Sequence, residues 1–189
     1  MTEQELLIDC LGRLNRIAVN YMITGSMASN YWGIPRTTHD LDFVLQLPTD
    51  SIPALVREFE KDFHIDELAI RRAFSAPYQF NAIDTRSALK VDFWILQTHP
   101  FEREMFQRRL QVSLFDTLAW LSTAEDVILH KLYWNTITPS ERQLHDAAGV
   151  VAVQGLELDI SYLRHWADQL EVTETLNLLL SRDIRPKSS

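Results

Sequence analysis

The chain has 189 residues, of which 46% are hydrophobic and 23% are charged, so it can bury a core of ordinary size. Its formal net charge of -8 disfavours broad, sequence-independent binding to DNA, because such binding depends on neutralising phosphates. The single cysteine, Cys10, excludes an internal disulfide, and no stretch reaches the roughly 18 uncharged apolar residues of a membrane span. Without a recognisable secretion signal, a cytoplasmic protein that is not inserted in a membrane is expected.

The first half of the chain alternates helical and strand-like segments. A capping box at Thr2–Glu5, followed by apolar residues at helical spacing, predicts a helix to about Ala18. The apolar run 19–24 indicates a buried strand that stops at Gly25. The other elements expected here are a helix at 26–32, a strand at 41–47, a helix from about 48–53 to 63, and strands at 78–83 and 88–96 joined as a hairpin by the turn 84–87.

Beyond Pro100 the pattern becomes mainly helical. A short helix at 101–108 and a strand at 110–115 precede a second capping box at Ser122–Glu125, which opens a helix carrying Lys131. The fold class expected is α/β (α+β), with a mixed β-sheet flanked by helices and followed by a helical C-terminal part. Further helices are predicted at 139–153 and 161–180, and the expected divisions are a core at 1–118, a helical part packed on it at 119–184, and a frayed tail at 185–189.

Three aspartates occupy strand-like segments and are candidates for one acidic site. Asp40 and Asp42 alternate with apolar residues, so they are expected on one side of a strand, about 7 Å apart along the chain. Asp92 lies in a second strand, and it joins them if the two strands are neighbours. Carboxylates held so close together repel unless cations neutralise them, and two Mg²⁺ or Mn²⁺ ions suit such oxygen ligands.

Each of these groups also has a structural interpretation. Asp40 and Asp42 are compatible with a helix cap or a solvated strand end. Asp92 is equally compatible with a solvent-facing ion pair with Lys90. Gly25-Ser26 marks a turn from a strand into a helix, which suits phosphate through the helix N-terminus but also occurs in many α/β proteins.

In combination, these motifs resemble those of a known group of enzymes. Gly25-Ser26, an interval of thirteen residues, Asp40-x-Asp42 and the later Asp92 are similar to the signature of the DNA polymerase beta type nucleotidyltransferase superfamily. Within that superfamily, the chain from about 19 to 155 resembles the AbiEii toxin-like nucleotidyltransferases and their uncharacterised relatives. There a helical lysine, an arginine and an aspartate follow the carboxylates, and the matching residues here are Lys131, Arg142 and Asp146.

The resemblance implies an enzyme that transfers a nucleoside monophosphate from a nucleoside triphosphate such as ATP to a hydroxyl acceptor and releases pyrophosphate. It implies that Asp40 and Asp42 bind both ions, and that Asp92 completes the metal site and helps to deprotonate the attacking hydroxyl. Phosphate binding is expected from Gly25, Ser26, Lys131 and Arg142, with Arg36, His39 and Asp146 in supporting roles. The structural alternatives are a lysine that snorkels from an amphipathic helix, and an Arg142–Asp146 pair at i,i+4 spacing.

The sequence is compatible with three functions. The first is a toxin-like enzyme that modifies tRNA or a protein, with an antitoxin as partner. The second is an enzyme that modifies a small hydroxylated molecule such as an antibiotic. The third is a nucleotide-binding relative without catalysis. A basic groove beside Asp92 would favour RNA, whereas an acidic pocket would favour a cationic small molecule.

Overall fold

The computed structural model describes residues 1–181, which form two compact units. The first unit consists of Met1–Thr24 and Thr38–Leu121, and the second consists of Gly25–Thr37 with the chain from Ser122 onward. Within the described chain, no helix combines the length and apolar content that crossing a membrane requires. The tail expected at 185–189 lies outside the described residues.

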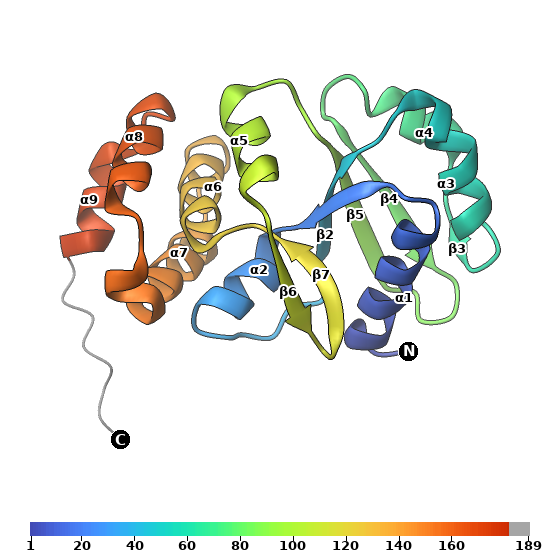
Figure 1. Cartoon of the computed structure of the whole chain (residues 1–189), viewed down its shortest axis with the longest axis horizontal. Coiled ribbons are helices and arrows are strands. Elements are labelled where there is room, and N and C mark those ends of the chain that lie inside the picture. The colour runs from blue at the N-terminus through green and yellow to red at the C-terminus, as the bar shows by residue number, and fades with distance from the viewer. Residues whose placement is uncertain (182–189) are drawn as a thin grey trace. The chain divides into compact units, whose positions relative to one another are not determined.

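A seven-stranded mixed sheet forms the centre of the first unit (Figure 1). The strand order is β3-β4-β5-β2-β1-β7-β6, in which β2–β5 and β1–β7 are parallel pairs and the other neighbours are antiparallel. The predicted mixed sheet and the predicted hairpin, which is β4–β5, are therefore confirmed. The strands are β1 (Asn20–Ile23), β2 (Leu41–Gln46), β3 (Phe63–His64), β4 (Gln79–Asp84), β5 (Lys90–Ile95), β6 (Leu110–Leu114) and β7 (Thr117–Leu121).

Helices α1 and α3 pack on the apolar face of this sheet. The predicted capping box starts α1, because the Thr2 hydroxyl accepts from the Glu5 N–H and the Glu5 carboxylate accepts from the Thr2 N–H. In α3, Phe59 meets the ring of Phe93 edge-on, and Arg13 of α1 lies over Phe59. The helical elements of this unit are α1 (Glu3–Arg16), a 3-10 turn at Thr49–Ser51, α3 (Ile52–Phe59), α4 (Glu67–Arg72) and α5 (Pro100–Arg108).

The two faces of the central strands differ in chemistry because successive side chains alternate. On one face Phe43 and Phe80 both stack on Phe93, and all three rings are buried. Burial of these rings against α3 holds β2, β4 and β5 together. The opposite face of β2 and β5 carries the aspartates.

The second unit is helical. Helix α2 approaches α7 closely at Gly33, where an added Cβ would stand 2.8 Å from the Val150 nitrogen. The Trp32 indole N–H donates to the Ser122 carbonyl, which ties the end of α2 to the start of α6. The helices are α2 (Gly25–Trp32), α6 (Ala124–Ile137), α7 (Glu141–Gln154), a 3-10 turn at Gly155–Glu157, α8 (Ile160–Gln169) and α9 (Thr173–Ser181).

Two helix predictions for the C-terminal part were wrong in detail. The helix predicted at 161–180 is broken into α8 and α9 by a Schellman ending, in which Glu171 has φ 58° and the Val172 N–H bonds to the Ala167 carbonyl. Helix α6 is capped by Thr123, whose hydroxyl accepts from the Asp126 N–H, and not by Ser122. The Glu125 carboxylate accepts instead from the Asp159 N–H at the start of α8.

The prediction for the first unit missed β3, α4 and β7, and the helix expected to reach 63 ends at Phe59. Strand β7 pairs with β6 through a two-residue turn in which Phe115 and Asp116 have φ values of 50° and 60°. Such turns usually contain Asn or Gly. Phe-Asp carries no such signal, so the hairpin was not recognised.

Candidate active site

Asp42 and Asp92 stand side by side in the first unit. They are directly paired in the parallel ladder of β2 and β5, so their side chains leave the sheet from the same face. Neighbouring strands are about 4.8 Å apart, which brings the two carboxylates within reach of one ligand. The condition on which Asp92 joins the acidic site, that its strand is a neighbour of the Asp42 strand, is therefore met.

Asp92 has an unusual environment for a carboxylate. The residue is only 7% exposed, and its Oδ2 lies 2.7 Å from the ammonium of Lys90. Within residues 1–181 no donor forms a hydrogen bond with its buried Oδ1. A buried carboxylate oxygen without a donor is costly. Its presence beside Asp42 therefore fits a site for a divalent cation.

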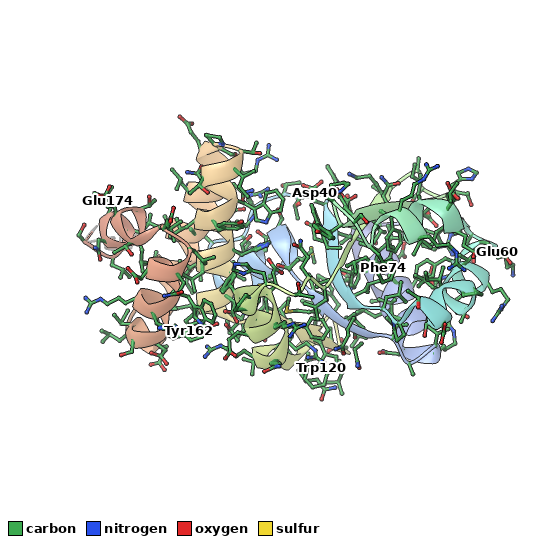
Figure 2. All side chains as sticks on the ribbon, turned by 90° about the horizontal axis from the view of Figure 1, so that it is seen from above. Asp40, Glu60, Phe74, Trp120, Tyr162 and Glu174 are labelled. Carbon is green, nitrogen blue, oxygen red and sulfur yellow. The ribbon has the colours of Figure 1, made fainter. Side chains whose placement is uncertain are left out.

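Asp40 and His39 lie just before β2, and Figure 2 shows Asp40 at the beginning of this strand. Asp40 is exposed, and its backbone N–H donates to the Thr38 hydroxyl at 3.2 Å. The imidazole of His39 instead contacts the carboxylate of Glu3 in α1. On the neighbouring strand, the Trp94 indole N–H lies 3.5 Å from Asp42 Oδ1.

Lys90 forms an ion pair with Asp92 on this face. The hydrogen bond with Asp92 raises the pKa of Lys90 above its ordinary value, and the charges of Asp40 and Asp42 contribute to the same shift. No three acidic, histidine or cysteine side chains of the described chain form a ready-made metal cage. The ammonium of Lys90 instead pairs with Asp92 on this face.

In the second unit, a cationic cluster surrounds Ser26 at the start of α2. Arg36 donates to Asp146 twice, with Nε 2.7 Å from Oδ1 and Nη2 2.9 Å from Oδ2, and Nη2 also lies 2.9 Å from the Ser26 hydroxyl. Lys131 of α6 lies 2.9 Å from Asp146 Oδ2. Gly25 has φ 63°, a left-handed conformation that glycine adopts without strain.

Local contacts fix this cluster. The Asn30 side chain accepts from the Arg36 N–H at 3.0 Å and donates to the Arg36 carbonyl at 2.7 Å, which holds the loop after α2. Burial opposes ionisation of Asp146, but hydrogen bonds from Arg36 and Lys131 outweigh it and keep its pKa below the ordinary value. One carboxylate thus faces two cations, and the cluster has a net positive charge.

The fold is shared with solved structures. No protein-family model and no curated protein sequence matches the chain. The antibiotic-resistance factor ANT(2'')-Ia matches with a TM-score of 0.60 and 11% identity over 93% of this chain and 96% of that one. A nucleotidyltransferase-like protein from Paracoccidioides brasiliensis matches with a TM-score of 0.57 and 15% identity over 97% and 94%. The lincosamide adenylyltransferase LnuA matches with a TM-score of 0.55 and 10% identity over 81% and 98%.

The chain has the nucleotidyltransferase fold. This result confirms the predicted fold class. Identities of 10–15% establish that the fold is shared. They do not establish a shared reaction, which depends on the residues of the site.

Arg142 lies outside the ion-paired cluster that contains Ser26 and Lys131, two of the other predicted phosphate ligands. Arg142 is exposed on α7 and forms no ion pair with any residue of 1–181. Asp146, four residues later, pairs with Arg36 and Lys131 instead. Arg36 was expected only in a supporting role, yet its guanidinium makes the contact with Ser26.

Lys90 and Trp94 were missed as parts of the acidic face. Lys90 was considered only as a solvent-facing partner of Asp92. The alternation of β5 contained the signal, because residues 90, 92 and 94 point to one side of the strand while 91, 93 and 95 are buried on the other. What the sequence did not reveal was which side chains of β2 they would meet.

Proposed function

We propose that this protein is a metal-dependent nucleotidyltransferase that transfers a nucleoside monophosphate from a nucleoside triphosphate to a hydroxyl acceptor and releases pyrophosphate. The observation that carries the proposal is the unpartnered, buried Oδ1 of Asp92 beside the paired Asp42, on the polar face of a nucleotidyltransferase-fold sheet. A structural ion pair with Lys90 accounts for Oδ2 only. The free oxygen is accounted for by a ligand.

Asp42 and Asp92, with Asp40 at the start of the strand, would hold two Mg²⁺ or Mn²⁺ ions. When bound, the ions would neutralise the carboxylates and stabilise negative charge that develops on the phosphates. Asp92 would complete the metal site and help to deprotonate the attacking hydroxyl. Asp40, which is exposed, can adjust its side chain to a ligand.

The second unit carries the groups suited to the triphosphate. Arg36 and Lys131 are cations held in place by Asp146, and the first N–H groups of α2 follow the left-handed Gly25. A helix N-terminus with a fixed guanidinium is a common arrangement for binding phosphate oxygens. Arg142 would add a further positive charge from the exposed surface of α7.

A small hydroxylated acceptor is favoured by charge. Three carboxylates against one lysine make the face around Asp92 acidic, and the net charge of the chain is -8. Such a surface repels RNA but attracts a cationic small molecule. Two of the similar structures were solved with small molecules, ANT(2'')-Ia with adenylyl-2''-tobramycin (TM-score 0.60, 14% identity over 89% of this chain and 98% of that one) and LnuA with lincomycin.

A macromolecular acceptor is the second candidate. The order of Lys131, Arg142 and Asp146 resembles the toxin-like AbiEii group, for which tRNA or protein acceptors and an antitoxin partner are expected. Arg142 is exposed on α7, where a cation is accessible to a large polyanion.

Label transfer tests these proposals directly. The purified protein is incubated with Mg²⁺ or Mn²⁺, each α-labelled nucleoside triphosphate in turn, and separate acceptors: an aminoglycoside and lincosamide panel, total tRNA, and a cell extract. The matched variants are Asp42→Asn, and Asp50→Asn on the exposed 3-10 turn of the same unit. Transfer is expected with wild type and Asp50→Asn and not with Asp42→Asn. Triphosphate binding without transfer to any acceptor would instead indicate a non-catalytic relative.

A further inference from the structure

We propose that Lys90 is a built-in counter-cation of the carboxylate site, which a divalent ion must displace from Asp92, so that Lys90 sets the metal affinity of the site. The inference rests on the proposed function, because it concerns the same carboxylates. It adds that the site is neutralised in part by the chain itself before any ion arrives.

The geometry places Lys90 beside Asp92, at the start of β5. Lys90 and Asp92 project from the same side of β5, and the ammonium lies 2.7 Å from Asp92 Oδ2. The ladder pairs Leu41 with Val91, so one further step in register brings Asp40 beside Lys90. Lys90 is therefore flanked by the carboxylate of its own strand and by the segment leading into β2.

The charges support the same conclusion. The Lys90 ammonium forms an ion pair with Asp92, and the ladder of β2 and β5 places Asp42 beside Asp92. One positive charge among three negative ones leaves the face with an excess of two negative charges. A divalent ion would neutralise more of the charge of the three carboxylates than the single charge of Lys90 does. This difference favours exchange of Lys90 for the ion.

Lys90 and Asp92 differ in their exposure to solvent. The Lys90 side chain is 51% exposed, whereas that of Asp92 is 10% exposed. Asp92 is thus fixed, with one oxygen on Lys90 and the other without a donor, while Lys90 has a flexible stem with access to water. An ion that enters at Oδ1 would repel the ammonium and release it to solvent without any change in the sheet.

Removal of the competing charge should therefore tighten metal binding. Since a partly exposed ion pair contributes little free energy, Lys90→Met is expected to bind Mn²⁺ up to about fivefold more tightly than wild type. Lys90→Arg keeps the charge and should bind Mn²⁺ about as wild type does. Lys61→Met removes a lysine charge from the exposed turn after α3 and serves as the matched control.

The measurement is a titration of each full-length variant with Mn²⁺, in which free Mn²⁺ is counted by electron paramagnetic resonance and folding is checked by circular dichroism. Lys90→Gln accompanies Lys90→Met, so that a folding defect in one leaves the other as a test. Asp92→Asn should lose most of the binding. Tighter binding by the two neutral variants, with Lys90→Arg and Lys61→Met unchanged, supports the inference.

Two outcomes would overturn the inference about Lys90, and only one of them would also overturn the proposed function. If wild type binds Mn²⁺ and the neutral variants bind it equally or more weakly, Lys90 is not a competitor, but the proposed function stands. If neither wild type nor any Lys90 variant binds Mn²⁺, with or without a triphosphate, both the inference and the metal-dependent function fail.

Discussion

Arg36 and Asp146 are 110 residues apart in the sequence and form a two-bonded ion pair within the second unit. The same guanidinium donates to Ser26, so one side chain connects the start of α2 to the middle of α7. The Asp146 side chain is 3% exposed and that of Arg36 is 23% exposed, so the carboxylate end of the pair is the buried one. It serves stability and, in the proposed function, the positioning of a phosphate-binding cation.

Arg36→Lys tests both roles. Lysine keeps the charge but cannot present the planar fork, so at least one hydrogen bond to Asp146 or Ser26 is lost. We expect the free energy of unfolding to fall by about 1–3 kcal/mol, measured by urea denaturation. The KM for the triphosphate should rise by about tenfold, because an imperfectly held cation binds phosphate less well.

Arg142→Lys is the control for this prediction, because Arg142 lies exposed on the same helix as Asp146. Its effect on stability should stay within about 0.5 kcal/mol. Equal losses in the two variants would show that the Arg36 contacts have no special importance.

Asp92→Asn should separate activity from stability. The amide removes a negative charge from the proposed metal site, and transfer should fall by about 100-fold or more in a pyrophosphate-release assay. Stability should change by less than about 1 kcal/mol, because the carboxylate it replaces is buried with one oxygen unsatisfied. A large drop in melting temperature would contradict this and assign Asp92 a structural role.

His130 should make the protein sensitive to mild acid. Burial lowers the pKa of His130 to about 4, and the charge of Lys131 acts in the same direction. The Trp134 indole N–H donates to His130 Nε2 at 2.8 Å, which requires that nitrogen to be unprotonated. Because the unfolded chain takes up the proton first, the stabilisation is present above about pH 6.5 and is lost as the pH falls towards 4.

The free energy of unfolding should fall by on the order of 1 kcal/mol between about pH 6.5 and pH 4, since part of the His130 surface remains exposed. Urea denaturation between pH 7 and 4 measures it. His130→Gln should show a flatter pH dependence than wild type, and His145→Gln, at an exposed position of α7, should follow wild type. Identical slopes for wild type and His130→Gln would rule out this assignment.

Gly33→Ala should loosen the contact between α2 and α7. The added Cβ would lie 2.8–2.9 Å from backbone atoms of Val150, Gly149 and Ser29, none of which can rotate away. We expect a loss of about 2–3 kcal/mol in the free energy of unfolding. Since the Arg36–Asp146 pair depends on the same helices, the KM for the triphosphate should rise as well.

Gly12→Ala is the matched control for Gly33→Ala. Its Cβ would meet only the flexible end of Arg16, at 3.4 Å, in the middle of α1. The substitution should raise stability by about 0.5–1 kcal/mol, because glycine is unfavourable inside a helix. Destabilisation by both substitutions would point to a general intolerance of added methyl groups and not to the α2–α7 contact.

Local signals in the sequence determined much of the first unit. The capping box at Thr2–Glu5 acts within one turn, and it started α1 as predicted. The alternation of β5 acts within one strand, and it placed Asp92 opposite the buried face. Each of these features depends on residues only a few positions apart, so the pattern itself carries the information.

Other features depend on which segments meet, and only the tertiary structure decided them. The alternation of β5 already placed Lys90 and Asp92 on one side of the strand, but only the ladder with β2 gave Asp92 its other neighbour, Asp42. Arg36 forms its ion pair with Asp146 in a region where Gly33 allows the end of α2 to approach α7 closely. The sequence alone could not identify Asp42 as the neighbour of Asp92 or Asp146 as the partner of Arg36. Electrostatic interactions depend on distance and burial in space and not on separation in sequence.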